Sequence, residues 1–536
     1  MVKLFFFFFP FLVLAQSEDA WIYFNEKPNA QAYLNQPLLM LSQRSIERRL
    51  HHNIEINFTD VPIHQPYVSI IDEIENISVL AHSKWFNCVF VRGDLTNIQS
   101  AINLPFVSHI KYVNKSLNGF TSDSIIVYDK ALVNNKYEYL STRNYGLAQT
   151  QINIHQGQLL HEAGFKGNNK IIAVLDSGFL GVNTATNFQH LFTENRILGG
   201  YNFVDRNDNP YSNHHHGTLV LSTMAINLEN EFVGTAPEAS YYLFVTEDIN
   251  SETALEEALW VEAAERADAL GVDIINTSLG YNTYDNANHS YTYEDMDGQT
   301  TFISKGSNMA FNKGIFCVTS AGNAGSSAWQ YITAPADAIN TLSVGAINSD
   351  LNYVNFSSIG PTSDGRVKPD VMALGRFSSV MNVSGEFITT NGTSFSAPIT
   401  AGLVASLWQA LPHLKNNELL QLIKENSSLF QNPTYQMGYG IPCFFCAYEQ
   451  ALSSENVHLS DAVIFPNPFQ NQINIILDES QNLPSKLRIK NSLGQVIFEK
   501  LIYDNQSQLE LNISKGLYFY EIEQGNKIFK SKIIKK

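Results

Sequence analysis

The sequence predicts an α/β fold, with a parallel sheet covered by helices on both faces. It also predicts an N-terminal α+β region and a C-terminal antiparallel β-sandwich. Two patterns indicate the parallel sheet: continuous apolar runs such as KIIAVLDSG and GIFCVTSAGN, and helical stretches between them such as ALEEALWVEAAERADALG. A third pattern, in which apolar and polar residues alternate between Gly and Asn turns, indicates the sandwich at the C-terminal end.

Residues 1–15 have the features of a secretory signal peptide. Lys3 supplies a positive charge, Leu4–Leu14 is apolar but too short to span a bilayer, and Ala15 ends a small-residue cleavage site. A buried core segment is the alternative reading. No later apolar run has transmembrane length, so we expect an exported, soluble protein.

Residues 16–113 alternate between strand and helix patterns and predict a small α+β domain. The expected strands are AWIYFNE, SKWFNCVFVRG and VSHIKYV, and the expected helices are LLMLSQRSIERRL, VSIIDEIENI and DLTNIQSAINL. Residues 114–145 are polar and weakly patterned, which indicates a linker.

Residues 146–452 carry the parallel-sheet pattern, with further apolar runs at YYLFVTE, DIINTSLG and TLSVGAI. In such sheets, active sites lie at the carboxyl ends of the strands. Residues 460–536 show no helical period, and QINIILD and QLELNI alternate as exposed strands do, which predicts the β-sandwich.

Charge and cysteine content exclude several classes of protein. The formal charge is −17 and the pI about 5.3, so binding to a nucleic-acid backbone is not expected. Four cysteines are too few for a disulfide-built scaffold. Cys443 and Cys446 predict either a local disulfide or buried thiols, and Cys88 and Cys317 read as core residues.

Three residues are candidates for nucleophilic catalysis. Ser394 lies in NGTSFSAP before an apolar helical run, His216 precedes Gly-Thr at the start of another, and Asp176 ends the most apolar strand in LDSG. Taken singly, these residues would be a helix cap, a loop histidine and a strand-end turn. A serine nucleophile needs a base to accept its proton and an acid to orient that base.

The order Asp176, His216, Ser394, together with SAGNAG around Asn323, closely resembles the subtilisin-like serine proteases of peptidase family S8, the subtilases. The resemblance covers residues 146–452 and implies the subtilisin-like fold. It implies that Ser394 attacks the scissile carbonyl, that His216 acts as base and then acid, and that Asp176 orients His216. It also implies that the Asn323 side-chain amide donates to the oxyanion.

The same resemblance implies a substrate site. Ser278, Leu279 and Gly280 would pair with an extended peptide and form one wall of the primary specificity pocket. Ser320, Ala321 and Gly322 would form the other wall. Small residues on both walls predict a roomy pocket for a large apolar side chain, while tight strand ends are the alternative.

A polar, aromatic-rich insertion follows Gly280 and is expected to shape specificity. Within it, Asp295–Gly298 (DMDG) resembles the start of a calcium loop, although the downstream Glu of such loops is missing. Calcium therefore stays open as a structural ion, there or elsewhere, and the resemblance implies no cofactor for the reaction itself.

The flanking regions fit an exported precursor. Residues 16–113 have the size and position of an inhibitory propeptide, with a permanent N-terminal domain as the alternative. Residues 460–536 resemble the C-terminal sorting domain of the type IX secretion system of Bacteroidetes, through Pro466-Asn467-Pro468 and Gly516-Leu517-Tyr518. A plain adhesive β-domain is the alternative. The sorting domain implies passage through the periplasm to the cell surface or the medium.

The expected function is that of a secreted serine endopeptidase, which hydrolyses peptide bonds through an acyl-enzyme intermediate. Its expected partners are protein or peptide substrates, its own propeptide and the type IX machinery. A non-catalytic adhesion protein is one alternative. An esterase is another, but its G-x-S-x-G frame differs from Gly392-Thr393-Ser394-Phe395-Ser396.

Overall fold

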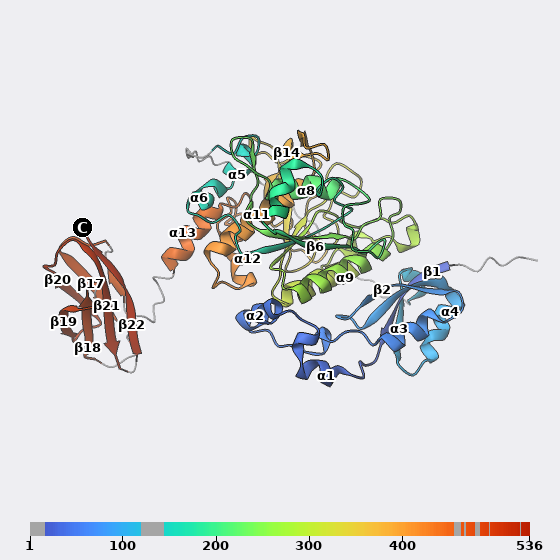
Figure 1. The fold of residues 1–536 in the computed structure, drawn as a ribbon, viewed down its shortest axis with the longest axis horizontal. Coiled ribbons are helices and arrows are strands. Elements are labelled where there is room, and N and C mark those ends of the chain that lie inside the picture. The colour runs from blue at the N-terminus through green and yellow to red at the C-terminus, as the bar shows by residue number, and fades with distance from the viewer. Residues whose placement is uncertain are drawn as a thin grey trace, which may run out of the picture. The chain divides into compact units, whose positions relative to one another are not determined.

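The computed structural model describes residues 17–118, 144–454, 463–465, 468–477, 483–491, 494–525 and 527–536. The chain forms two compact units, the first ending at Ala447 and the second beginning at Tyr448 (Figure 1). The predicted signal peptide 1–15, most of the predicted linker, and Pro466 and Asn467 lie outside the described residues.

The N-terminal region is an antiparallel sheet with helices on one face, in the order β2-β3-β1-β4. Its elements are β1 (Ser17–Phe24), α1 (Ala30–Asn35), α2 (Gln43–His52), α3 (Gln65–Asp72), β2 (Ile77–Ser83), β3 (Cys88–Asp94), α4 (Leu95–Ser100) and β4 (Val107–Tyr112). The expected strand SKWFNCVFVRG is instead the end of β2, a turn and β3.

Alternation along β1 divides its side chains between two cores. Ala20, Ile22 and Phe24 point into the core of the N-terminal region. Trp21 points the other way and stacks on Phe302, with the ring centroids 3.5 Å apart. The other face of this sheet is therefore covered by the rest of the first unit.

The central sheet of the first unit has seven parallel strands in the order β13-β12-β11-β10-β5-β9-β6, which confirms the predicted fold class. The strands are β5 (Ile171–Asp176), β6 (Ile197–Asn202), β9 (Ser240–Val245), β10 (Ile274–Thr277), β11 (Phe316–Ser320), β12 (Leu342–Ile347) and β13 (Val371–Leu374). Two hairpins, β7 (Asn227–Leu228) with β8 (Phe232–Val233) and β14 (Ser378–Met381) with β15 (Phe387–Thr390), complete its strands. The sequence patterns missed β6 and β13.

Helices cover both faces of this sheet. α8 (His216–Ala225) packs on α11 (Thr393–Ala410), and α11 lies across β10 to β13. α9 (Leu255–Leu270) packs on α10 (Phe302–Asn312), and Figure 1 shows α8 and α9 on opposite sides of the sheet. The remaining helices are α5 (Gln149–Asn153), α6 (Gly157–Glu162), α7 (Gln189–Thr193), α12 (Asn416–Glu425) and α13 (Phe444–Ser454).

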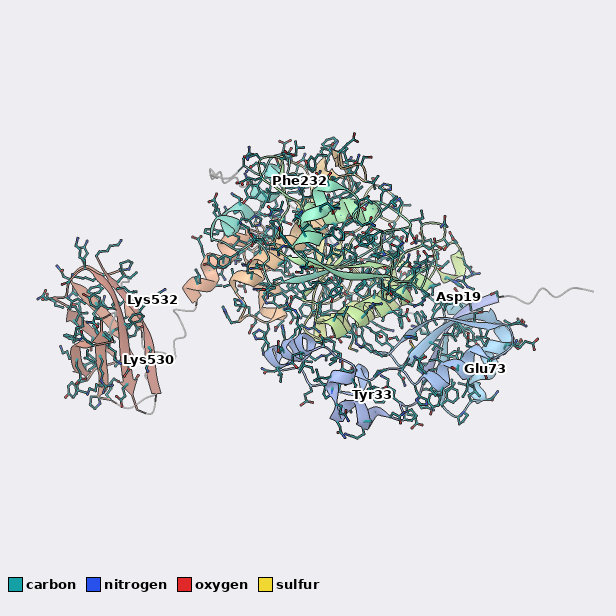
Figure 2. The ribbon with its side chains drawn as sticks, in the orientation of Figure 1. Asp19, Tyr33, Glu73, Phe232, Lys530 and Lys532 are labelled. Carbon is teal, nitrogen blue, oxygen red and sulfur yellow. A yellow bond between two sulfur atoms is a disulfide. The ribbon has the colours of Figure 1, made fainter. Side chains whose placement is uncertain are left out.

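The second unit consists of two antiparallel sheets around a shared apolar core, as the sequence predicted. The strands are β16 (Val463–Phe465), β17 (Gln472–Ile476), β18 (Ser485–Lys490), β19 (Val496–Ile502), β20 (Gln506–Glu510), β21 (Gly516–Gln524) and β22 (Lys527–Lys535). Lys530 and Lys532 lie two residues apart on β22 and are exposed (Figure 2), whereas Ile533 is buried in the core.

The cysteines follow the predictions. Cys443 and Cys446 form a local disulfide, and Cys88 and Cys317 are free and buried. Within the described residues, no helix combines the length and apolar character needed to cross a membrane.

A buried cluster of charges joins the N-terminal region to α9. Arg48 and Arg49 on α2 both bind the carboxylate of Asp268, at 2.5 and 2.7 Å. Asp60 binds Arg49 at 2.7 Å and Lys313 at 2.8 Å. The side chain of Asp268 is fully buried, and these two arginines are the cations that bind it.

We expect Asp268→Asn to weaken this contact by about 3–5 kcal/mol, because the variant leaves two buried arginines without their shared counter-charge. Thermal unfolding of the full-length chain measures the effect as a lower midpoint. Asp208→Asn is the matched control, because Asp208 is 89% exposed and lies 3.9 Å from Arg266. Equal midpoints for the two variants would contradict the role given to Asp268.

Candidate active site

Asp176 ends β5 at the point where the order of the strands reverses. β5 pairs with β10 on one side and β9 on the other, and both pairs are parallel. The carboxyl ends of the three strands therefore meet at one edge, which is where open α/β sheets bind ligands. Asp176 is only 1% exposed there.

His216, the first residue of α8, lies against Asp176. Its Nδ1 is 2.8 Å from Asp176 Oδ1, which also accepts a hydrogen bond of 2.8 Å from the Ser177 backbone N–H. Since the carboxylate only accepts, His216 carries a proton on Nδ1, and Nε2 is the basic nitrogen of the neutral ring. This is the tautomer that a general base needs.

The surrounding charges favour the protonated form of His216. Burial alone would lower the pKa of His216, but the charge and hydrogen bond of Asp176, with the charge of Glu247, outweigh burial and raise it. Burial, together with the charges of Asp176 and Glu252, raises the pKa of Glu247 to about 7. Glu247 follows β9 at the same edge of the sheet.

Ser394 is the second residue of α11, where backbone N–H groups have no partner within the helix. The chain enters the helix through Gly392, whose φ of +150° favours glycine. Ser394 Oγ donates to the Ser278 carbonyl at 3.3 Å, and Ser278 Oγ donates to the Ser394 carbonyl at 2.9 Å. The ring of Phe395 lies 5.8 Å from that of His216, which brings the start of α11 beside the histidine.

Asn323 is held by Thr393, the residue before Ser394. Asn323 Oδ1 accepts from the Thr393 backbone N–H at 2.9 Å and from Thr393 Oγ1 at 3.1 Å. A backbone N–H can only donate, so this contact fixes which end of the Asn323 amide is oxygen. The other end of the amide, Nδ2, is therefore the donor, on a residue joined to the neighbour of Ser394.

The residues of the predicted substrate site follow two neighbouring strands. Ser278, Leu279 and Gly280 follow β10, and Ser320, Ala321 and Gly322 end or follow β11. No sequence pattern indicated Thr333, which lies beside both segments. A methyl group on Gly280 would lie 2.3 Å from Thr333 Oγ1, and one on Gly322 would lie 3.0 Å from it.

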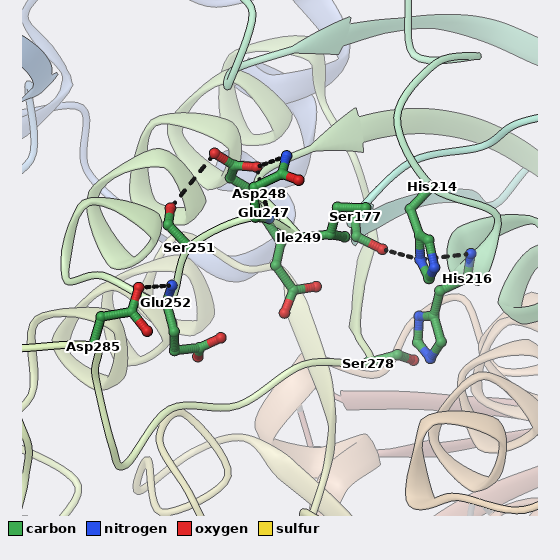
Figure 3. A pocket seen from close by; sticks show the side chains of 11 residues that line it. Ser177, His214, His216, Glu247, Asp248, Ile249, Ser251, Glu252, Ser278 and Asp285 are labelled. Carbon is green, nitrogen blue, oxygen red and sulfur yellow. Dashed lines mark hydrogen bonds between the residues drawn. The ribbon is translucent and has the colours of Figure 1, made fainter.

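A cavity of about 430 Å³ adjoins His216 and Ser278 (Figure 3). His214, His216 and Ser177 line one side, and the loop after β9 lines the other with Glu247 and Glu252. Ser177 and His214 were not predicted as site residues. Their only sequence signal is their position beside Asp176 and His216.

The insertion after Gly280 packs on α9 and on the N-terminal region. Tyr284 and Tyr291 donate to Glu257 at 2.6 and 2.5 Å, and His289 Nε2 lies 2.6 Å from Glu18 Oε1. The insertion thus has a structural role that the sequence did not indicate.

The DMDG segment does not fit a calcium loop. Asp295 binds Lys115 and caps the turn at Thr292, and Asp297 accepts from the backbone of Gln299 and Thr300. Within the described part of the chain, no group of three His, Cys, Asp or Glu residues has the arrangement of a metal site.

Three family models match the chain. Residues 167–440 match the subtilase family, residues 19–127 the peptidase S8 propeptide domain of Bacteroidota, and residues 463–536 a secretion system C-terminal sorting domain. The first match spans just over half of the 536 residues.

Curated relatives agree with these matches. Subtilisin NAT of Bacillus subtilis subsp. natto and subtilisin E of Bacillus subtilis strain 168 are each 30% identical over 303 residues, covering 56% of this chain and 70% of theirs. Among solved structures, MycP1 with its propeptide removed covers 56% of this chain and 96% of its own, at 21% identity and a TM-score of 0.45.

The pKa of His216 gives a testable pH dependence. A base must be neutral to act, so we expect the rate at which a fluorophosphonate reagent labels Ser394 to fall below a midpoint that lies above 6.5, the ordinary pKa of histidine. Glu247→Gln removes a negative charge that favours the imidazolium, so it should move the midpoint to lower pH.

Asp248→Asn is the matched control for this measurement, because Asp248 is the adjacent carboxylate but does not contribute to the shift at His216. Rate–pH profiles of the three exported proteins, freed of residues 16–113, make the comparison. A midpoint that stays unchanged in Glu247→Gln would show that its charge does not act on His216.

Proposed function

The chain belongs to the subtilase family of serine proteases, and on that premise we propose that Ser394, His216, Asp176 and Asn323 carry out its reaction. The protein is a subtilisin-like endopeptidase with a propeptide domain and a C-terminal sorting domain for secretion. The observation that carries the proposal is the 2.8 Å contact between His216 Nδ1 and Asp176 Oδ1 next to the start of α11.

In the proposed mechanism, the Ser394 hydroxyl turns from the Ser278 carbonyl toward His216 Nε2 when substrate binds. Oγ then attacks the scissile carbonyl carbon while His216 accepts the proton, and Asp176 stabilises the imidazolium. Asn323 Nδ2 and the backbone N–H of Ser394 stabilise the oxyanion. His216 returns the proton to the leaving amine, and water hydrolyses the acyl-enzyme by the same steps in reverse.

We further propose the domain order of the precursor. A signal peptide (1–15) precedes a propeptide (16–113), which occupies the enzyme and inhibits it. Cleavage in the linker (114–145) separates it from the catalytic domain (146–452), and the type IX machinery reads the sorting domain (460–536). The buried ion pairs between α2 and α9 support a tightly packed complex of propeptide and enzyme.

Fluorophosphonate labelling tests the catalytic residues. We expect an adduct on Ser394 of the exported, propeptide-free protein, located by mass spectrometry of the modified peptide. His216→Ala should abolish the adduct, because the serine then has no base. A propeptide-free wild-type protein that takes up no reagent would refute the proposal, whereas an unlabelled precursor shows only that the propeptide blocks access.

Thr333 leads us to propose a preference for a short side chain before the scissile bond, in place of the large apolar side chain expected from the sequence. The residue is 5% exposed and its side chain lies against Gly280 and Gly322, so it fills space between the two walls. Among the described residues, its hydroxyl has no hydrogen-bond partner, and a small polar side chain of a substrate would supply one.

We expect Thr333→Gly to raise kcat/KM for a peptide with Phe before the scissile bond by about tenfold or more, relative to the same peptide with Ala. The change removes the side chain that narrows the pocket. Thr333→Ser is the matched control, because it keeps the hydroxyl. If the Phe-to-Ala ratio stays the same in Thr333→Gly, the pocket lies elsewhere.

A further inference from the structure

The hydroxyl of Ser177 lies between the Asp176 carboxylate and a second histidine. Ser177 Oγ is 3.3 Å from Asp176 Oδ1 and 3.1 Å from Nδ1 of His214. Figure 3 shows the resulting chain of contacts from Ser177 through His214 to His216. One hydroxyl proton therefore faces two acceptors, and the state of His214 decides which of them receives it.

The backbone of His216 fixes the tautomer of neutral His214. The His216 N–H lies 3.4 Å from His214 Nδ1, and a backbone N–H can only donate. Nδ1 of the neutral ring is therefore the acceptor, and the ring proton is on Nε2. In this state, His214 holds the first residue of α8 by its backbone and Ser177 by its hydroxyl.

Backbone contacts hold the loop after Asp176 in register with the loop before His216. Gly178 pairs with Asn213 in an antiparallel bridge, and the Leu180 N–H donates to the His214 carbonyl at 3.2 Å. A Cβ on Gly178 would lie 2.5 Å from the His214 backbone nitrogen, so only glycine allows this approach. His214 is thus placed by the same contacts that bring the loops of Asp176 and His216 together.

We propose that His214 is a positioning residue of the proteolytic reaction, which acts through Ser177 on Asp176 and through the backbone on His216. The proposal rests on the roles proposed above for Asp176 and His216. In its neutral form, His214 accepts from both neighbours and keeps the acid and the base in register. In its protonated form, His214 Nδ1 accepts neither hydrogen bond, and its contacts with Ser177 and with the His216 backbone change.

Protonation of His214 reverses the direction of its hydrogen bond with Ser177. Nδ1–H then donates to Ser177 Oγ, and the Ser177 hydroxyl donates to Asp176 Oδ1. The additional donor withdraws charge from Asp176 and weakens its support of the His216 imidazolium. Nδ1 also loses its lone pair, so the His216 backbone N–H loses its acceptor. Both effects reduce activity.

The groups around His214 favour its neutral form under working conditions. Burial and the charges of His215 and His216 lower the pKa of His214, and Asp176 opposes this effect. Glu247, Glu252 and Asp285 line the cavity that His214 faces, and the first two have pKa values raised to about 7. The protonated form therefore develops only as the pH falls below the pKa of His216.

The test compares His214→Asn with His214→Ala by kcat/KM profiles on one peptide substrate. The Asn side-chain oxygen takes the place of Nδ1 and accepts from both neighbours, but it does not become protonated. We expect His214→Ala to lower kcat/KM about three- to tenfold at the plateau, because it removes two hydrogen bonds. His214→Asn should restore most of this loss.

The acid limb gives a second readout, which a merely structural residue would not change. In a plot of log kcat/KM against pH, the wild-type slope should steepen from one toward two at low pH, because a second imidazole is protonated below the pKa of His216. In His214→Asn the slope should stay at one. In the control His215→Asn the slope should still steepen, because His215 is exposed and makes no contact with Ser177 among the hydrogen bonds of the described residues; the loss of its charge only moves that step to higher pH.

The outcomes separate this inference from the proposed function. A wild-type kcat/KM in His214→Ala, or identical acid limbs in wild type and His214→Asn, would overturn the role of His214. If His214→Ala does not mature, the acid limbs of wild type and His214→Asn still decide the question. Activity that survives His216→Ala would instead overturn the proposed catalytic residues.

Discussion

The parallel pairing of β5 with β9 and β10 determines where each site residue lies. Because the strands run in one direction, the residues that follow them emerge at the same edge of the sheet: Asp176 after β5, Glu247 after β9 and Ser278 after β10. The helices α8 and α11 also begin at this edge, and the positive end of α11 lies at Ser394. The site is thus a consequence of the sheet topology.

Polar groups at this edge are held by hydrogen bonds that cross between loops. Thr393 joins Asn323 to the start of α11, and Ser278 joins β10 to Ser394. Groups held in this way need little reorganisation when charge develops on the substrate. The acidic loop after β9 also acts on this site, because the negative charge of Glu247 favours the protonated form of His216.

The sequence predicted the elements whose signal is local and missed those that depend on distant contacts. Continuous apolar runs identified β5 and β11, but β6 contains Gly199 and Gly200 and has no such run. The apolar run of β13 is only four residues long, and periodicity alone does not assign so short a run to a strand. Asp176, His216 and Ser394 were identified by short local frames. Thr333 and His214 have no such frame, since their positions depend on segments that are far away in the chain.

The charge cluster between α2 and α9 constrains the order in which the precursor acquires its structure. Arg48 and Asp268 are 220 residues apart in the chain. During synthesis, Arg48 and Arg49 therefore have no partner on α9 until the chain through Asp268 has been made. The propeptide domain completes this buried contact only when α9 packs against it, so part of its stability depends on the enzyme.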